Sequence, residues 1–260
     1  MKKTAFISGA SSGIGAEFAK IHAAAGDNLV LVARRKDRLL TLKETLEKEN
    51  KIQVFVIQKD LTATNAAQEV YKEIKDAGIE IDYLINNAGF GNLGNFHEQD
   101  VTVGLNMIQL NITALTALTH LFLSDFVSKN SGKILNVSST AAFMPGPLQA
   151  VYFATKAYVT SFSNAIAEEL SNTNITVTTL MPGATATEFA KMSGMEKTSL
   201  FKKTTSANDI AKAGYKGMMA GKLDVIAGLT FSQKVLMAAI PLTPKKIILK
   251  QIKKMQQIND

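Results

Sequence analysis

Short apolar runs alternate with longer helical segments along most of the chain, and this alternation constrains the fold more than any other feature of the sequence. The apolar runs have the length of buried strands, and the segments between them have the length and pattern of helices. Strands are predicted at residues 4–8, 28–33, 52–57, 81–85, 133–137, 175–181 and 224–227. Helices are predicted at residues 16–25, 35–49, 63–77, 113–127, 152–170 and 207–220. This order predicts a three-layer α/β fold with a doubly wound parallel sheet of about seven strands.

Length and composition fit a single domain. The chain has 260 residues, of which 46% are hydrophobic, and it contains no linker-like stretch and no internal repeat. The sequence has no cysteine, which excludes disulfides and thiolate metal sites. The three histidines, at positions 22, 97 and 120, do not have the spacing of metal ligands. No metal site is therefore predicted.

The positive charge is concentrated late in the chain. Lysine and arginine number 29 against 22 acidic residues, which gives a net charge of +7. Five of the lysines, at positions 245, 246, 250, 253 and 254, lie within ten residues. Elsewhere the charges are mixed and no basic, aromatic platform is present, so we expect no nucleic-acid partner. The first apolar run is too short for a signal peptide, and we expect a cytoplasmic protein.

A glycine-rich loop, GASSGIG at residues 9–15, connects the first strand to the first helix. Strand, glycine loop and helix in this order are typical of a loop that holds phosphate groups. Glycine tolerates positive φ and lets backbone N–H groups approach a pyrophosphate, and the helix N-terminus adds partial positive charge. The spacing G-x3-G-x-G differs from the general dinucleotide pattern G-x-G-x-x-G. In its context the loop nevertheless predicts nucleotide binding.

Arg34 and Arg35 directly follow the second strand, where the chain has no acidic residue. An acidic residue at this place would bind a ribose 2′-hydroxyl and favour NAD, whereas arginine suits the 2′-phosphate of NADP(H). The alternative is a solvated charged turn that opens the next helix, since Lys36, Asp37 and Arg38 follow. Together with the glycine loop, the two arginines favour NADP(H) as the cofactor.

Several polar and glycine-containing motifs follow strand ends, and these ends meet at one edge of a parallel sheet. The motifs are Asp60-Leu61, Asn87-Ala88-Gly89, Ser139 and Pro182-Gly183. Residues 184–201 are small, polar and then mixed, which suits a mobile flap over a substrate. Asn111, at the start of the helix predicted at 113–127, is most simply a helix cap.

Tyr152 and Lys156 lie four residues apart on a predicted helix, so both side chains leave the same face. Ser139 lies upstream, at the end of a predicted strand. An ammonium about 4 Å from a phenol stabilises the phenolate by roughly 4 kcal/mol before desolvation, so we expect Lys156 to lower the pKa of Tyr152. The phenol then exchanges protons as a general acid or base. The alternative is a solvated Tyr–Lys pair on the surface.

With these motifs in place, the sequence resembles the classical short-chain dehydrogenase/reductase family over roughly residues 3–228. The resemblance rests on GASSGIG at 9–15, NNAG at 86–89 and Ser139 with Tyr152-x3-Lys156, as well as on Asp60-Leu61, Asn111, Pro182-Gly183 and Thr187. It implies a Rossmann-like fold and NAD(P)-linked reduction of a carbonyl or oxidation of an alcohol. Residues 1–229 would form the NAD(P)-binding core with its built-in catalytic site, and residues 230–260 a basic helical extension of the same domain.

The resemblance also implies residue roles. Tyr152 would donate or accept the proton, Lys156 would lower its pKa and bind the nicotinamide ribose, Ser139 would hold the substrate oxygen, and Asn111 would hold a relay water. Ser138 is the competing serine, but the family spacing of thirteen residues before the tyrosine selects Ser139. The cofactor would be bound by Gly9, Ser11, Ser12, Gly13, Ile14, Gly15, Arg34, Arg35, Asp60, Leu61, Asn87, Ala88, Gly89, Tyr152, Lys156, Pro182, Gly183, Thr185 and Thr187.

The leading hypothesis is an NADPH-dependent oxidoreductase that acts on a small-molecule carbonyl or secondary alcohol. Two alternatives stay open: a non-catalytic NADP-binding regulator, and a reductase of lipid-like acyl or sterol substrates at a membrane surface. The basic tail is interpreted as a packing or subunit-contact element in preference to a membrane-surface helix. By analogy with the family, we expect a homodimer or homotetramer.

Overall fold

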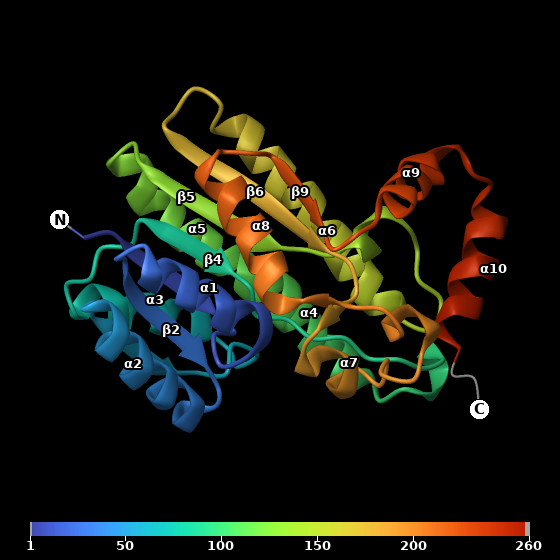
Figure 1. Cartoon of the computed structure of the whole chain (residues 1–260), viewed down its shortest axis with the longest axis horizontal. Helices are drawn as coiled ribbons and strands as arrows, with labels where there is room; N and C mark the ends of the chain where they lie inside the picture. The colour runs from blue at the N-terminus through green and yellow to red at the C-terminus, as the bar shows by residue number, and fades with distance from the viewer. Residues whose placement is uncertain (1, 258–260) are drawn as a thin grey trace.

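Seven parallel strands form one sheet at the centre of the molecule (Figure 1). The computed structural model describes residues 2–257. The strands are β1 (Thr4–Ser8), β2 (Asn28–Ala33), β3 (Val54–Gln58), β4 (Tyr83–Asn86), β5 (Gly132–Val137), β6 (Ile175–Pro182) and β9 (Asp224–Ala227). Their order across the sheet is β3-β2-β1-β4-β5-β6-β9, which reverses between β1 and β4. The predicted doubly wound parallel sheet of about seven strands is confirmed.

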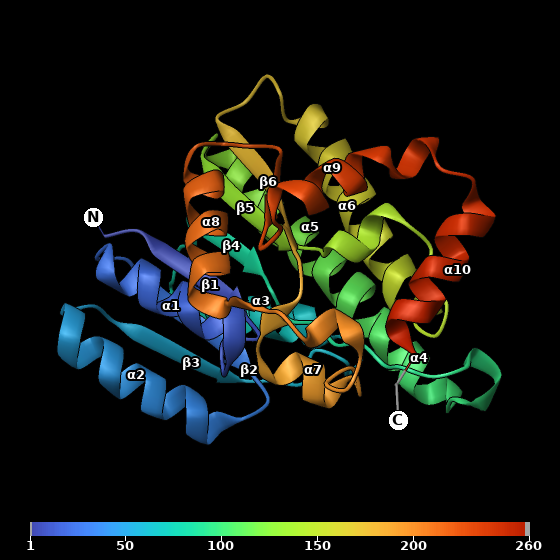
Figure 2. The same ribbon diagram turned by 45° about the vertical axis from the view of Figure 1, so that its right-hand side comes forward.

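Helices cover both faces of the sheet (Figures 1 and 2). On one face lie α1 (Gly13–Ala24), α2 (Lys36–Asn50) and α8 (Ala207–Met219), and on the other lie α3 (Ala66–Asp76), α5 (Leu115–Ser128) and α6 (Ala150–Glu169). Successive strand residues point to opposite faces, so Ala5 and Ile7 of β1 pack with α1 while Phe6 packs with α5. The strands are apolar on both sides because both sides are covered.

The helix predicted at residues 113–127 begins a dozen residues earlier. α4 (Val101–Ile108) runs through a π-helical segment (Gln109–Ala114) into α5. Asp100 caps the start, where its carboxylate accepts a hydrogen bond from the Thr102 N–H at 2.9 Å. The cap assigned to Asn111 was therefore wrong, because Asn111 lies inside the π-helical segment. By length and composition alone this 28-residue helix is apolar enough to span a membrane, a property that core helices share.

The chain after β9 forms two helices that arch away from the sheet, drawn in red in Figure 1. α9 (Phe231–Ala239) begins with a capping box between Thr230 and Gln233, and α10 (Lys245–Gln256) follows a short turn. Ile248 and Ile252 of α10 pack into an apolar cluster that also contains Tyr152. The tail thus returns to the part of the fold that carries the predicted catalytic residues.

Candidate active site

One cavity of about 540 Å³ runs along the carboxyl edge of the sheet, at the place where the strand order reverses. All of the residues predicted to bind the cofactor line this cavity except Gly15, and so do three of the four residues predicted to be catalytic. Gly15, the last residue of the glycine loop, packs against the Gly9 carbonyl and the Asn87 amide, and Asn111 is buried behind the cavity wall. The structure therefore brings together motifs that are up to 178 residues apart, from Gly9 to Thr187.

The glycine loop is tightly packed against the loop after β4. Gly9 has a φ of +67°, and a Cβ atom there would lie 2.9 Å from the Ala88 Cα. The Asn87 amide donates hydrogen bonds to the backbone oxygens of Ser8 and Gly9, at 3.0 and 3.3 Å. A Cβ on Gly15 would approach the same amide Nδ2 to 2.5 Å. Asn87 thus fixes the shape of the loop as well as lining the cavity.

The loop fits an anionic group. The N-cap residue of α1, Ser12, makes no side-chain capping hydrogen bond. The first N–H groups of a helix have no intrahelical partner, so those of α1 are available to a ligand phosphate. The cavity wall beside them includes Ser11 and Gly13. This is the arrangement that a dinucleotide pyrophosphate requires.

The two predicted cofactor arginines have different surroundings. Arg35 donates hydrogen bonds to the hydroxyls of Ser11, at 3.1 and 3.3 Å, and of Ser12, at 2.9 Å. Arg34 is 63% exposed and lies 3.9 Å from an oxygen of Asp60. Arg35 is therefore held in place beside the glycine loop, whereas the Arg34 side chain is exposed and makes only one long contact among the described residues.

Two charged residues beside Arg35 were not predicted. Glu188, the first residue of α7 (Glu188–Met192), accepts hydrogen bonds from Arg35 at 2.8 Å and from Arg38 at 2.5 Å. These arginines lower the pKa of Glu188 to about 2. Arg38 could have been found from its i,i+3 spacing to Arg35 on the predicted helix. Glu188 could not, because 153 residues separate it from Arg35.

Ser139 and Tyr152 lie at the other end of the cavity. Ser139 begins the 3-10 turn Thr140–Phe143, where its Oγ accepts a hydrogen bond from the Ala141 N–H at 3.1 Å. Ser138, the competing serine, uses its hydroxyl to contact the Lys156 carbonyl and Thr160, both at 2.8 Å. The geometry thus leaves Ser139 as the serine beside the phenol.

The expected lowering of the Tyr152 pKa is not found, because the surrounding protein groups raise this pKa. Tyr152 and Lys156 are 8% and 5% exposed. Burial raises the pKa of Tyr152 to about 12, against a smaller opposite effect of the Ser139 hydroxyl. Burial lowers the pKa of Lys156 to about 8. The lysine Nζ donates to the Val137 carbonyl at 2.9 Å and lies 5.8 Å from the centre of the tyrosine ring, over its face, so that desolvation outweighs attraction.

Asn111 joins two walls of the site. Its Nδ2 donates to the Phe90 carbonyl at 3.0 Å and to the Thr155 Oγ1 at 3.1 Å, and its Oδ1 accepts from the Phe90 N–H at 3.1 Å. The wide turn of the π-helical segment places this side chain between the loop after β4 and helix α6. Asn111 is therefore a positioning residue in this structure, and its contact with a relay water stays a prediction.

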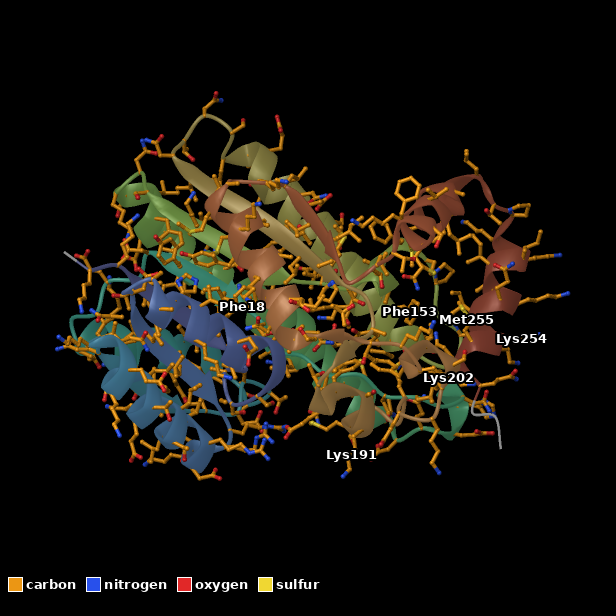
Figure 3. All side chains as sticks on the ribbon, viewed as in Figure 1. Phe18, Phe153, Lys191, Lys202, Lys254 and Met255 are labelled. Atoms are coloured by element: carbon orange, nitrogen blue, oxygen red, sulfur yellow. The ribbon has the colours of Figure 1, made fainter. Side chains whose placement is uncertain are left out.

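The remaining cavity wall is apolar and rich in methionine. Residues 184–201, predicted as a flap, supply Phe189, Met192, Met195, Leu200 and Phe201. Phe153 on α6 and Met255 on α10 extend this wall and pack in one apolar cluster, and they lie near each other in Figure 3. Gln149 is 2% exposed, and its Oε1 has no hydrogen-bond partner among the described residues.

A family model described as short chain dehydrogenase matches residues 3–198, which is most of the chain. The chain belongs to the short-chain dehydrogenase family. Among curated family members, human very-long-chain 3-oxoacyl-CoA reductase is 33% identical over 72% of this chain and 61% of its own length. Mouse 17-beta-hydroxysteroid dehydrogenase type 3 is 34% identical over 85% of this chain and 70% of its own length. The chain thus spans about two thirds of the length of these curated relatives.

Two solved structures of family members match nearly the whole chain. A short-chain dehydrogenase from Sphingobium yanoikuyae in complex with NADPH is 32% identical, covers 99% of this chain and 98% of its own, and has a TM-score of 0.83. A bulky-bulky ketone specific alcohol dehydrogenase from Comamonas testosteroni is 30% identical, covers 99% and 96%, and has a TM-score of 0.79. The similarity to these structures therefore includes the two helices of the tail.

Proposed function

We propose that this short-chain dehydrogenase is an NADPH-dependent reductase of carbonyl compounds, which also runs in reverse as a dehydrogenase of secondary alcohols. One observation carries the proposal: Ser139, Tyr152 and Lys156 line one end of the same cavity whose other end holds the glycine loop and Arg35. A dinucleotide that lies along this cavity has its phosphates at one end and its reactive ring beside the phenol. The NADPH complex of the Sphingobium relative supports the choice of cofactor.

The side chains support a simple acid-catalysed reduction. When bound, a nicotinamide supplies the hydride. The Ser139 hydroxyl donates a hydrogen bond to the carbonyl oxygen, and the phenol of Tyr152 gives this oxygen a proton as negative charge develops. With a pKa near 12 the phenol is fully protonated at pH 7, yet it is far more acidic than an alcohol. A protonated Lys156, 5.8 Å from the ring centre, stabilises the phenolate that remains.

The cavity wall favours a bulky apolar substrate. Methionine and phenylalanine side chains from α6, the flap and the tail surround the space next to Tyr152. Methionine is flexible and polarisable, so such a wall adapts to large apolar groups of different shape. Similarity to the Comamonas enzyme for bulky-bulky ketones, to the 17-beta-hydroxysteroid dehydrogenase and to the very-long-chain 3-oxoacyl-CoA reductase supports the same class of substrate.

A substrate screen with NADPH, followed at the nicotinamide absorbance, tests this function. The panel contains ketones with two bulky substituents, a long-chain 3-oxoacyl thioester, a steroid ketone, and small hydrophilic aldehydes as the control class. We expect turnover with the bulky apolar ketones and much less with the small aldehydes. Tight NADPH binding without turnover of any compound would instead support the non-catalytic regulator, and activity with the lipid-like compounds alone would support the acyl or sterol reductase.

Replacing Gly15 with alanine is expected to weaken NADPH binding by about tenfold or more, because the new Cβ would collide with the Asn87 amide and deform the loop. The measurement is a fluorescence titration with NADPH, together with thermal unfolding. Gly104→Ala is the matched control, since a Cβ there meets only the Val151 Cγ2 at an ordinary 3.6 Å. Equal affinity of the Gly15 variant and the wild type would refute the assignment of the loop.

We also propose that the chain forms a homodimer or homotetramer through α4. Val101, Leu105 and Ile108 are 62%, 58% and 39% exposed and lie on one face of this helix. Leu105→Glu should shift the mass measured by light scattering toward the monomer, because the charge would be buried at the contact. Leu40→Glu, on exposed α2, is the control and should leave the mass unchanged. A wild type that is monomeric would contradict the proposal.

A further inference from the structure

Glu188 connects the substrate side of the cavity to the cofactor side. It is the first residue of α7, within the flap, and its two carboxylate oxygens each bind a different arginine of the β2–α2 region. Arg35, Arg38 and Glu188 are 38%, 45% and 40% exposed, so the cluster is partly solvated and accessible to a ligand. In Figure 2 α7 lies close to the ends of β1 and β2, next to the start of α2.

The Glu188 carboxylate occupies the one terminal nitrogen of Arg35 that is not bonded to a serine hydroxyl. Arg35 directs its Nε and Nη2 at the hydroxyls of Ser11 and Ser12, and its remaining terminal nitrogen, Nη1, at Glu188. A guanidinium presents its donors in a fixed planar fork, and carboxylate and phosphate compete for the same donors. A 2′-phosphate that binds Arg35 must therefore displace Glu188 or accept a like charge beside it.

We propose that Glu188 is a specificity-determining residue for the cofactor, which weakens the binding of NADP(H) by competing with the 2′-phosphate for Arg35 and Arg38. NADH carries no phosphate at this position, so it leaves the ion pairs intact. The competition reduces the preference for NADPH that the arginines create, and it speeds the release of NADP⁺ after turnover. This inference rests on the proposed use of NADP(H).

The competition has a consequence for the flap. Displacement of Glu188 by the 2′-phosphate releases the ion pairs that hold α7 against α2. Binding of NADPH then loosens the N-terminal end of α7, whereas binding of NADH does not. Through Glu188, binding of the cofactor 2′-phosphate therefore changes the contacts of the flap that lines the substrate space.

Binding constants of the wild type and Glu188→Gln for four probes test the inference: NADPH, NADH, 2′,5′-ADP and 5′-AMP. Glutamine keeps the size of the side chain and removes the charge. We expect Glu188→Gln to bind NADPH and 2′,5′-ADP roughly three- to tenfold more tightly, in line with two exposed ion pairs, and NADH and 5′-AMP within twofold of the wild type. The gain should shrink at high salt. Since 2′,5′-ADP has no nicotinamide, a gain there assigns the effect to the phosphate end.

Asp76→Asn is the matched control. It changes the net charge by the same amount, but the carboxylate it removes belongs to a remote ion pair with Lys72. It should leave all four affinities unchanged. Weaker or unaltered binding of NADPH by Glu188→Gln, or an equal gain for NADPH and NADH, would overturn the inference. A wild type that binds neither NADPH nor NADH would instead contradict the proposed function itself. The failure of the inference and the failure of the proposed function therefore give different results.

Discussion

Replacing Tyr152 with phenylalanine is expected to lower the rate of ketone reduction by about 10²- to 10⁴-fold, the usual contribution of a general acid, and to leave NADPH binding within twofold of the wild type. The substitution removes only the hydroxyl group. The ring keeps its contact with the Phe189 ring, and the two ring centres lie 5.4 Å apart. The measurements are kcat from NADPH oxidation and Kd from fluorescence titration.

Tyr158→Phe is the matched control for this variant. Tyr158 lies six residues further along the same helix, is 37% exposed, and its hydroxyl contacts Thr116 at 3.0 Å. Its loss should leave kcat unchanged. If Tyr152→Phe reduces ketones as fast as the wild type, Tyr152 is not the proton donor.

The pH dependence of wild-type activity follows from the pKa values of Tyr152 and Lys156. The pKa of Tyr152 near 12 keeps the phenol protonated throughout the neutral range, so the proton to be donated is present. The pKa of Lys156 near 8 means that its positive charge is present below about pH 8 and is lost as the pH rises through that value. Because this charge stabilises the phenolate product of the proton transfer, we expect kcat for reduction to fall above about pH 8.

The double variant Arg34→Ala/Arg35→Ala is expected to lose the preference for NADPH over NADH. A hydrogen bond to a charged group contributes about 1.5–3 kcal/mol, so binding of NADPH should weaken by roughly 10- to 150-fold, while binding of NADH stays nearly unchanged. Arg35→Ala alone should account for most of the loss, because Arg35 is fixed by Ser11 and Ser12 and Arg34 is 63% exposed.

Lys36→Ala is the control, because Lys36 is a neighbouring exposed cation that does not line the cavity. It should change neither affinity. If the arginines formed only a solvated charged turn, the double variant would behave like this control. A wild type that prefers NADH would contradict the cofactor assignment directly.

Much of the fold could be predicted because the chain repeats one local pattern. β1, β2 and β9 have the predicted boundaries, and the other strands differ by one or two residues at one end or both. Their residues are apolar on both faces, and the intervening helices have clear ends, such as Gly26 after α1. The parallel order then places every strand end at one edge, which is why most of the predicted cofactor residues line one cavity.

The start of the long helix could not be predicted in the same way. Residues 101–112 contain glycine and β-branched residues, which have low helix propensity, so the local sequence does not indicate a helix there. Asn111 therefore looked like a cap, whereas its amide lies in a π-helical turn and holds Phe90 and Thr155.

The electrostatics of the site also needed the three-dimensional structure. The spacing showed that Tyr152 and Lys156 share a helix face, but it did not show that both are buried. Burial raises the pKa of Tyr152 and lowers the pKa of Lys156, so it favours the neutral form of each. The contact between Glu188 and Arg35 joins the flap to the second strand, and no local pattern indicates it. The packing of α10 onto the cluster around Tyr152 is equally long-range.

Transfer of deuterium from the cofactor to the product tests the central claim most directly. NADPH with deuterium at both C4 positions is incubated with the protein and a bulky aryl ketone, and the alcohol is analysed by mass spectrometry. We predict one deuterium on the carbinol carbon of every product molecule, with the hydroxyl proton coming from solvent. An alcohol without deuterium, or no alcohol from any ketone of the panel although NADPH is bound, would contradict it.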